Sequence, residues 1–193
     1  GNSLYSSRDF FRDLRRRRDY RIWLDTRVKG FFARKSLDWA DCTVAPSEAY
    51  AAELRHMTRK RVAAIHHGFD RDLFFHDSSP LPSQTHNLLA TANGHLRLLY
   101  VSHYNYYRNF ETLFRAIARA RQKQPDLKIR LILTCKLRDH ANPGAYRTAA
   151  ASRLVTQLGI QDEVVELGAV PYRSLHHVYR TCDLYVTPAY TET

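Results

Sequence analysis

The chain has 193 residues, of which 44% are hydrophobic and 25% charged, a composition that is typical of a globular protein and argues against intrinsic disorder. The formal net charge of +11 favours anionic partners such as nucleic acid, lipid headgroups or nucleotide phosphates, without choosing among them. The three cysteines, Cys42, Cys135 and Cys182, are far apart, which argues against a disulfide framework and predicts buried, reduced thiols.

The first part of the chain predicts helices followed by two short strands. Residues 8–39 are rich in Arg, Phe, Leu and Trp and contain no proline, and their apolar residues recur at helical spacing. We therefore expect two or three amphipathic helices here. A strand is expected at 42–45, where Pro46 ends it, and Ser47 is the expected N-cap of the next helix. A second strand is expected at 61–65.

A change in composition marks the middle of the chain. Residues 76–95 are rich in Ser, Pro, Asn and Thr and have few large apolar side chains, which predicts a linker or long exposed loop at a domain boundary. After it, apolar strands alternate with helices; the strands are expected at 96–101, 129–133, 164–167 and 184–186. This alternation predicts a parallel, doubly wound α/β sheet whose strands are buried on both faces.

The last strand ends in a suggestive polar segment. Tyr190, Thr191 and Glu192 follow it, at the carboxyl edge of the predicted sheet, where ligands bind in open α/β folds. The chain stops at Thr193, before any helix that Glu192 would open, and it begins without an initiator methionine. We therefore expect a piece of an enzyme that lacks both ends, with poor solubility and little activity when it is isolated. The sequence contains no run of about 20 apolar residues, the length that a membrane-spanning helix needs, so no membrane span is predicted.

Five stretches, taken in order, carry a resemblance to a known family. They are Ala40–Glu48, Ile65–Phe74, Val101–His103 with Arg108–Leu113, Leu167–Pro171, and Cys182–Glu192. Together they resemble the group 1, family 4 glycosyltransferases, whose GT-B fold has two Rossmann-like doubly wound domains. By this resemblance, residues 1–75 end an amino-terminal acceptor-side domain, 76–95 form the linker, and 96–193 begin the carboxy-terminal nucleotide-sugar-binding domain.

The resemblance implies an activity for the intact protein. It would transfer a sugar from a nucleotide-diphosphate sugar to a glycan or lipid-linked glycan, with retention of configuration. The family acts without a bound metal or other cofactor, and we expect a cytoplasmic location. The ten histidines do not argue for zinc, because no two are spaced as His-x-x-x-His, and the adjacent pairs His66-His67 and His176-His177 are expected to point their side chains apart on a strand or helix.

The loop from Ser102 to Asn109 carries the chemistry that such a transfer needs. Expulsion of a diphosphate requires fixed positive charge and N–H donors where negative charge develops, and a helix beginning near Asn109 would present both its N–H groups and its positive dipole end. In the family this loop usually has a glycine, a basic residue soon after the strand, and a Lys or Arg before the helix. Arg108 fills the last position, whereas His103 replaces the first basic residue and Ser102 the glycine.

The resemblance extends to further donor-binding residues. Glu192 resembles the first glutamate of a pair that engages the donor sugar, and with Arg108 it is the expected catalytic residue; Tyr190 adjoins it. Gly168, Ala169 and Val170 resemble the loop that meets the nucleotide base, although Gly168 would equally suit a tight turn. Lys136 follows the second strand of the sheet and is also expected to contact the donor.

The run Arg15–Arg18 allows other readings. Clustered arginines beside Phe10, Phe11 and Trp23 are typical of a nucleic-acid surface, so the alternative function is a basic nucleic-acid- or membrane-surface-binding protein with an α/β fold. Nucleic acid is the less favoured partner, because no nucleic-acid-binding motif accompanies the run. Peripheral contact with anionic lipid at the inner face of the membrane would suit a lipid-linked acceptor. A third interpretation is that Arg15–Arg18 belong to a helix face that is exposed to solvent and binds no partner.

Overall fold

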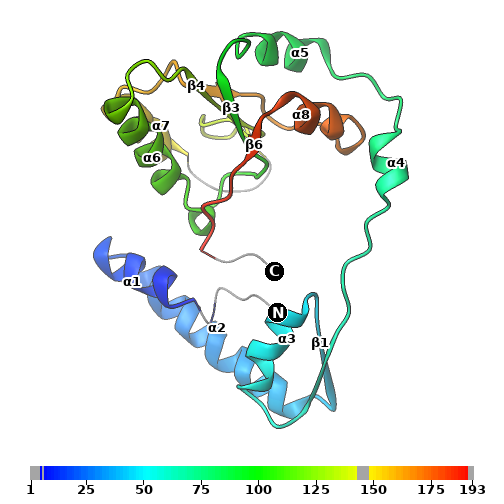
Figure 1. The fold of residues 1–193 in the computed structure, drawn as a ribbon. Helices are drawn as coiled ribbons and strands as arrows, with labels where there is room; N and C mark the ends of the chain where they lie inside the picture. The colour runs from blue at the N-terminus through cyan, green and yellow to red at the C-terminus, as the bar shows by residue number, and fades with distance from the viewer. Residues whose placement is uncertain (1–4, 6, 143–147, 191–193) are drawn as a thin grey trace. The chain divides into compact units, whose positions relative to one another are not determined.

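The computed structural model describes residues 5, 7–142 and 148–190, and these form two compact units (Figure 1). The amino-terminal unit extends to Phe69 and includes Tyr190, and the carboxy-terminal unit spans Asp70–Ala189. The assignment of the two parts of the chain to acceptor-side and donor-side domains stays a prediction.

In its described residues, the amino-terminal unit has three α-helices and two paired strands. Its elements are α1 (Arg8–Arg16), α2 (Tyr20–Trp39), β1 (Cys42–Ala45), α3 (Glu48–Arg55) and β2 (Arg61–Ala64). The predicted N-cap is confirmed, because Ser47 Oγ accepts a 3.2 Å hydrogen bond from the backbone N–H of Tyr50. The strands pair in parallel, with Cys42 opposite Arg61. Ala45, Ala51, Leu54 and Val62 form the small core between α3 and this pair.

The carboxy-terminal unit is built on a four-stranded parallel sheet. Its elements are α4 (Arg71–Phe75), α5 (Ser83–Ala90), β3 (Leu96–Tyr100), the 3₁₀ turn η2 (Tyr106–Arg108), α6 (Phe110–Lys123), β4 (Ile129–Leu133), α7 (Ala149–Leu158), β5 (Val164–Glu166), the 3₁₀ turn η3 (Tyr172–Ser174), α8 (Leu175–Thr181) and β6 (Leu184–Tyr185). The strand order is β5-β4-β3-β6, and every pair is parallel. Counted from β3, this is the 3-2-1-4 order of a Rossmann-like sheet. The predicted fold class is therefore confirmed.

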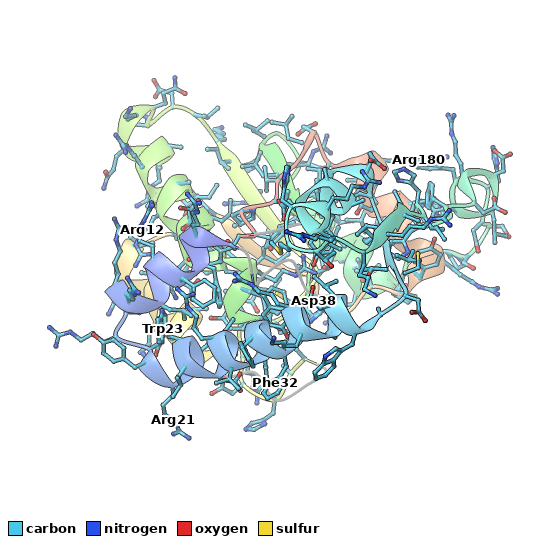
Figure 2. All side chains as sticks on the ribbon, turned by 90° about the horizontal axis from the view of Figure 1, so that it is seen from below. Arg12, Arg21, Trp23, Phe32, Asp38 and Arg180 are labelled. Carbon is cyan, nitrogen blue, oxygen red and sulfur yellow. The ribbon has the colours of Figure 1, made fainter. Side chains whose placement is uncertain are left out.

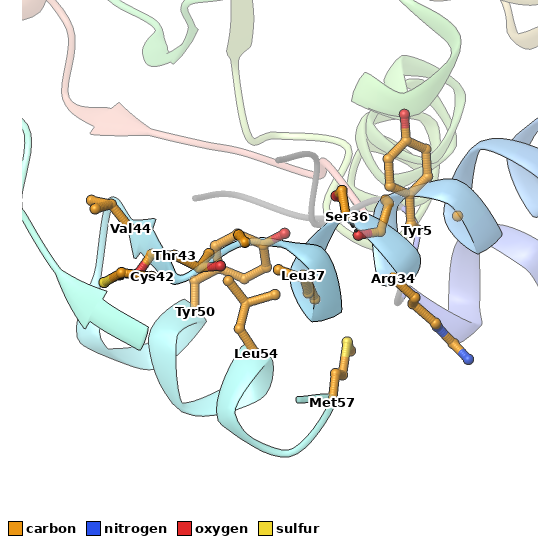
Figure 3. Close-up of a pocket in the computed structure, with 13 residues that line it drawn as sticks. Tyr5, Arg34, Ser36, Leu37, Cys42, Thr43, Val44, Tyr50, Leu54 and Met57 are labelled. Carbon is orange, nitrogen blue, oxygen red and sulfur yellow. Dashed lines mark hydrogen bonds between the residues drawn. The ribbon is translucent and has the colours of Figure 1, made fainter. Parts of the chain in front are cut away.

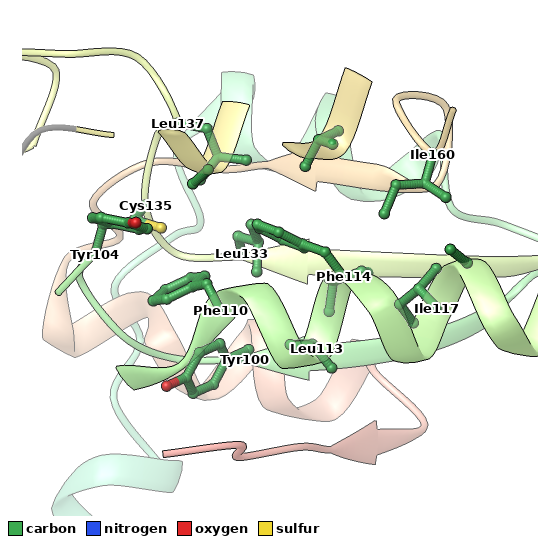
Figure 4. Packing of buried hydrophobic residues seen from close by; sticks show 14 of the residues in the cluster. Tyr100, Tyr104, Phe110, Leu113, Phe114, Ile117, Leu133, Cys135, Leu137 and Ile160 are labelled. Carbon is green, nitrogen blue, oxygen red and sulfur yellow. The ribbon is translucent and has the colours of Figure 1, made fainter. Parts of the chain in front are cut away.

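Alternating residues of the central strands feed two separate cores, one on each face of the sheet. Leu131 and Leu133 of β4 pack with α6 and α7, around Phe110 and Phe114 (Figure 4). The residue between them, Ile132, packs on the opposite face with Leu89 and Val178, from the α5 and α8 side. This period of two is the reason that residues 131–133 form a continuous apolar run in the sequence.

The expectation of a linker or exposed loop over 76–95 is wrong for its second half. Residues 83–90 form α5, and Leu89 is only 4% exposed, packed in the core that contains Leu99 and Ile132. Ala92, just beyond the helix, is fully buried in the same core. Two well-placed small or medium apolar residues suffice to dock a short helix on a sheet, so a mostly polar composition concealed it.

Two burial expectations are also corrected. The strand β6 is exposed, with Leu184 at 54% and Tyr185 at 51%, because it pairs only with β3 at the edge of the described sheet. Cys42, at the start of β1, is exposed rather than buried, whereas Cys135 is buried as expected and Cys182 is half-buried.

An ion pair fastens β6 to β3 at the edge opposite the strands' carboxyl ends. The Arg97 guanidinium contacts the Asp183 carboxylate at 2.9 Å and 3.2 Å, and the Arg97 backbone N–H donates to the same carboxylate at 2.8 Å. These hydrogen bonds stabilise the charged carboxylate and lower the pKa of Asp183. A two-residue strand thereby gains a polar anchor.

Candidate functional site

The strand order places a topological switch between β3 and β6. In open parallel sheets, ligands bind outside the carboxyl ends of the strands at such a point. The loop after β3 runs through η2 into α6, a helix of 14 residues, so the amino terminus of α6 lies beside this position. Its unpaired N–H groups and positive dipole end favour an anion there.

Asn109 joins the two sides of the switch. Its backbone is left-handed (φ 56°, ψ 39°), and its Nδ2 donates a 2.9 Å hydrogen bond to the carbonyl of Pro188, beyond β6. Its Oδ1 accepts from the Thr112 hydroxyl at 2.8 Å, in the first turn of α6. A single buried side chain thus fixes the loop after β3, the start of α6 and the segment after β6 relative to one another.

Arg108 stands directly before this helix, as the sequence predicts. Its carbonyl accepts a 2.8 Å hydrogen bond from the hydroxyl of Tyr100, the buried last residue of β3. Its half-buried guanidinium lies 5.4 Å from the centre of the Tyr107 ring. The backbone of Arg108 is therefore tied to the sheet, and a positive charge is held at the amino terminus of α6.

Ser102 and His103 begin the same loop but differ in accessibility. The Ser102 backbone N–H donates to Thr134 Oγ1 at 3.0 Å, which joins the ends of β3 and β4, and Ser102 Oγ donates to the carbonyl of His103 at 3.0 Å. The Ser102 side chain is buried and already bonded within the loop, whereas His103 is exposed. Of these two residues, only His103 presents its side chain to solvent.

Lys136 and the 168–170 loop lie together at the ends of β4 and β5. The Lys136 ammonium donates to the carbonyl of Glu166, and its methylene chain lies over Gly168, where an added Cβ would come within 3.1 Å of Lys136 Cε. Gly168 has a left-handed backbone (φ 81°). Ala169 is exposed, whereas Val170 packs partly into the core beneath the loop.

The final pair of predicted residues is not placed with the others. Tyr190 groups with the amino-terminal unit, where its ring packs 5.5 Å from Phe10 and its hydroxyl donates a 2.6 Å hydrogen bond to Asp13. Glu192 lies outside the described residues. The donor-binding and catalytic roles of the predicted residues all stay predictions.

Sequence reasoning missed Tyr100, Asn109 and Thr134, which hold the loop in place, and it missed Asn105. The Asn105 side chain is 1% exposed, and neither atom of its carboxamide finds a hydrogen-bond partner within the described part of the chain. Asn109 could have been found, because asparagine adopts left-handed backbone more readily than other non-glycine residues and it stands directly before a helix.

The thiol of Cys135 is poorly suited to act as a nucleophile. Cys135 follows β4, but burial raises the pKa of its thiol to about 12, so the thiolate form is scarce near neutrality. Among the described residues, no group of three or more His, Cys, Asp or Glu side chains is placed to hold a metal ion. No helix in the described ranges has the length and apolarity to cross a bilayer.

Comparison with known proteins gives the family. Residues 85–193, more than half of the chain, match the glycosyl transferases group 1. The chain belongs to this family. It is 29% identical over 160 residues to the D-inositol 3-phosphate glycosyltransferase of Thermobispora bispora, a match that covers 81% of this chain and 36% of that protein.

Solved structures share the fold of this group 1 chain. Anabaena HepE in complex with UDP-glucose superposes with a TM-score of 0.56 at 22% identity, covering 78% of this chain and 38% of that one. A structure described as trehalose-6-phosphate from E. coli bound with UDP-2-fluoro glucose gives 0.54 at 16% identity, covering 79% and 40%. The chain thus spans roughly two fifths or less of the length of these relatives.

Proposed function

We propose that this chain is the part of a retaining glycosyltransferase that binds the diphosphate of a nucleotide-sugar donor. The acceptor class that suits the proposal is a glycan or lipid-linked glycan. Membership of the group 1 family supports the reaction class. The related structures named above contain UDP-glucose and UDP-2-fluoro glucose, which supports a nucleotide sugar as the donor class.

The observation that carries the proposal is the anion-binding geometry at the switch between β3 and β6. The 14-residue helix α6 begins there, Arg108 precedes it, and Asn109 holds the loop to the segment after β6. A diphosphate leaving group needs fixed donors and positive charge in a site that is organised before the reaction starts. The bonds of Tyr100, Asn109 and Thr134 supply that rigidity.

The proposed step breaks the bond between the anomeric carbon and the diphosphate oxygen, which leaves with the bonding electron pair. An acceptor hydroxyl forms the new bond on the same face of the sugar, and its proton passes to the departing diphosphate oxygen. In this proposal Arg108 and the amino terminus of α6 stabilise the charge that develops on the leaving diphosphate. His103 is the additional exposed basic group, and Glu192 would contact the donor sugar. Gly168 and Ala169 would meet the nucleotide base with their backbone.

The remaining parts of the proposal concern location. We place the enzyme in the cytoplasm, with Arg15–Arg18 contacting anionic lipid at the inner membrane face if the acceptor is lipid-linked. In the amino-terminal unit, α1 and α2 expose many basic side chains, including Arg12 and Arg21 (Figure 2).

Calorimetric titration of a protein that contains this chain, against UDP-, GDP- and ADP-sugars, tests the proposal directly. We expect saturable binding of one nucleotide sugar, weakened by Arg108→Gln and unchanged by Arg115→Gln, an exposed arginine farther along α6. A short DNA duplex serves as the control ligand. If no nucleotide sugar binds and the DNA duplex binds in a salt-sensitive way, the result would instead support the alternative function, a basic nucleic-acid-binding protein.

A further inference from the structure

The amino-terminal unit contains a pocket that the donor site does not use. It has a volume of about 740 Å³ and lies where α1 packs against α2. Its lining includes six arginines, namely Arg8, Arg12, Arg15, Arg16, Arg27 and Arg34, together with Tyr5, Phe11 and Met57. Only Arg15 and Arg16 of the run Arg15–Arg18 belong to this lining.

Helical spacing gathers these arginines on facing surfaces. On α1, Arg8, Arg12, Arg15 and Arg16 are separated by three, four, seven or eight residues, with one adjacent pair, so they share one face. On α2, Arg27 and Arg34 are seven residues apart and share a face in the same way. The polar face of each helix thereby contributes guanidinium groups to one concave surface.

Few carboxylates offset this charge. Arg12 pairs with Asp9 at 3.2 Å in an exposed contact, whereas no carboxylate within the described ranges lies in ion-pair distance of Arg8, Arg15, Arg16, Arg27 or Arg34. Like charges gathered in a pocket repel one another and raise the local potential. An anion entering the pocket relieves this repulsion, so this arginine cluster favours a ligand with more than one negative charge.

Two of the guanidinium groups are already held in position. The Cζ atom of Arg27 lies 4.6 Å from the centre of the Phe11 ring and 5.2 Å from that of Trp23, and Arg15 Cζ lies 5.4 Å from Trp23. Both cations contact the same indole, so they are at most about 11 Å apart, close to the screening length of ~10 Å in 0.1 M salt. Contact with the ring faces restrains both guanidinium groups and leaves N–H groups for an anion.

From this geometry we infer that the pocket between α1 and α2 binds a compact phosphoryl-bearing ligand through Arg15, Arg16 and Arg27. Guanidinium forks match the oxygen pairs of a phosphoryl group, and a concave pocket suits a compact group better than an extended polymer. The phosphoryl group has two sources, a soluble phosphate ester or the headgroup of an anionic lipid. This inference does not depend on nucleotide-sugar binding in the carboxy-terminal unit.

The test is a calorimetric titration of a protein that contains this chain with inorganic pyrophosphate, at two salt concentrations, with the Arg108→Gln variant titrated in parallel to account for binding at the donor site. We expect saturable binding that Arg27→Gln weakens about tenfold, the scale of one charge-assisted contact. Arg27→Lys should give an intermediate affinity, because it keeps the charge and loses the fork. The matched control is Arg21→Gln, which removes the same charge from the same helix at a residue that does not line the pocket.

Arg16→Gln provides a second variant, because Arg16 is not one of the ring-stacked pair and its replacement should not disturb packing. Thermal unfolding by circular dichroism checks each variant. To separate the two sources, the same variants are titrated with glucose 6-phosphate and with phosphatidylcholine vesicles that contain or lack phosphatidylglycerol. The inference is supported if the affinities for either anionic probe rank the variants in the same order as the affinities for pyrophosphate. The probe that binds then identifies the source of the phosphoryl group.

Three results would overturn the inference. Equal weakening by Arg21→Gln and Arg27→Gln would show attraction by diffuse net charge rather than a site. Absence of saturable pyrophosphate binding at low salt would show that the pocket does not bind a phosphoryl group. Tight binding of a short RNA that Arg16→Gln and Arg21→Gln weaken alike would make this surface a nucleic-acid contact. Arg108→Gln changes the donor site and leaves this pocket intact. A failure of the donor proposal can therefore be told apart from a failure of this inference.

Discussion

Asn109 Nδ2 donates a hydrogen bond of 2.9 Å to the carbonyl oxygen of Pro188, across 79 residues of sequence. The bond connects the loop after β3 to the segment after β6, at the point where the strand order reverses. Because Asn109 also has a left-handed backbone and accepts from Thr112, one residue sets both the direction of α6 and the spacing of the two strand ends. The candidate anion site depends on that spacing.

Replacement of Asn109 should therefore cost stability in two separable parts. Asn109→Gly keeps the left-handed backbone and loses the side-chain bonds, and we expect it to lower the free energy of unfolding by about 1 kcal/mol. Asn109→Ala loses both and should cost about 2 kcal/mol. Urea unfolding followed by circular dichroism measures the difference. Equal stability of the two variants would show that the left-handed backbone contributes nothing here.

Arg108→Ala should reduce transfer activity in an active enzyme that contains this chain. Loss of one positioned donor to the leaving diphosphate is expected to lower kcat/KM by roughly 3 kcal/mol in transition-state terms. Arg115→Ala, the matched change at an exposed position of α6, should leave kcat/KM unchanged. A fall of less than about threefold for Arg108→Ala would remove Arg108 from the diphosphate site.

Gly168→Ala should destabilise the carboxy-terminal unit. The left-handed backbone alone disfavours alanine by about 1 kcal/mol, and the added Cβ would also meet Lys136 Cε at 3.1 Å. Gly94→Ala is the control, because Gly94 has a similar φ of 75° with open space around it. Chemical denaturation of both variants should show a larger cost at Gly168 than at Gly94. Equal costs would mean that Lys136 moves aside freely.

The Arg97–Asp183 pair predicts a loss of stability in acid. Hydrogen bonds from Arg97 lower the pKa of Asp183 in the folded protein from its ordinary value of 3.8. The stabilisation is therefore complete above the unfolded pKa near 3.8 and is lost as the pH falls through the lower, folded pKa. Asp183→Asn should flatten this part of the dependence of the unfolding free energy on pH between 6 and about 2. An identical acid slope in the variant would contradict the prediction.

Thiol labelling should distinguish the three cysteines. Burial raises the pKa of Cys135 to about 12 and that of Cys182 to about 11, so both should react slowly in the native protein. Cys42 is exposed and should be alkylated first. Mass spectrometry after brief treatment with iodoacetamide, with and without denaturant, measures the order. Native labelling of Cys135 as fast as Cys42 would mean that this part of the sheet opens readily.

The apolar pattern of the sequence predicted the strands of the sheet well. Residues 131–133 are apolar because both faces of the strand are covered, and the expected bounds 129–133 agree with the observed strand although Arg130 interrupts the run. The other strands of the sheet end one residue earlier than expected. The pattern failed for α5, whose few buried residues are scattered through a polar segment. It also failed for β6, because an edge strand and a central strand carry the same apolar residues and differ only in their neighbours.

A pocket in the amino-terminal unit is a further feature that the local sequence pattern does not reveal. Gly30, Leu37, Tyr50 and Leu54, from α2 and α3, line a mostly apolar pocket of about 410 Å³ with β1 (Figure 3). Helical spacing marks each helix as amphipathic, but the angle at which two helices pack decides whether a hollow remains between them. The same reason explains why the arginine pocket is seen only once α1 and α2 are in place.

The sequence by itself determined the α/β class, the order of strands and helices, and the basic residue Arg108 before α6, because periodicity and local charge are properties of neighbouring residues. Only the tertiary structure showed the 3-2-1-4 strand order, the bond from Asn109 to Pro188 and the meeting of arginines from two helices. Those features join residues far apart in the chain. Their geometry is set by how the sheets and helices pack, which no local pattern records.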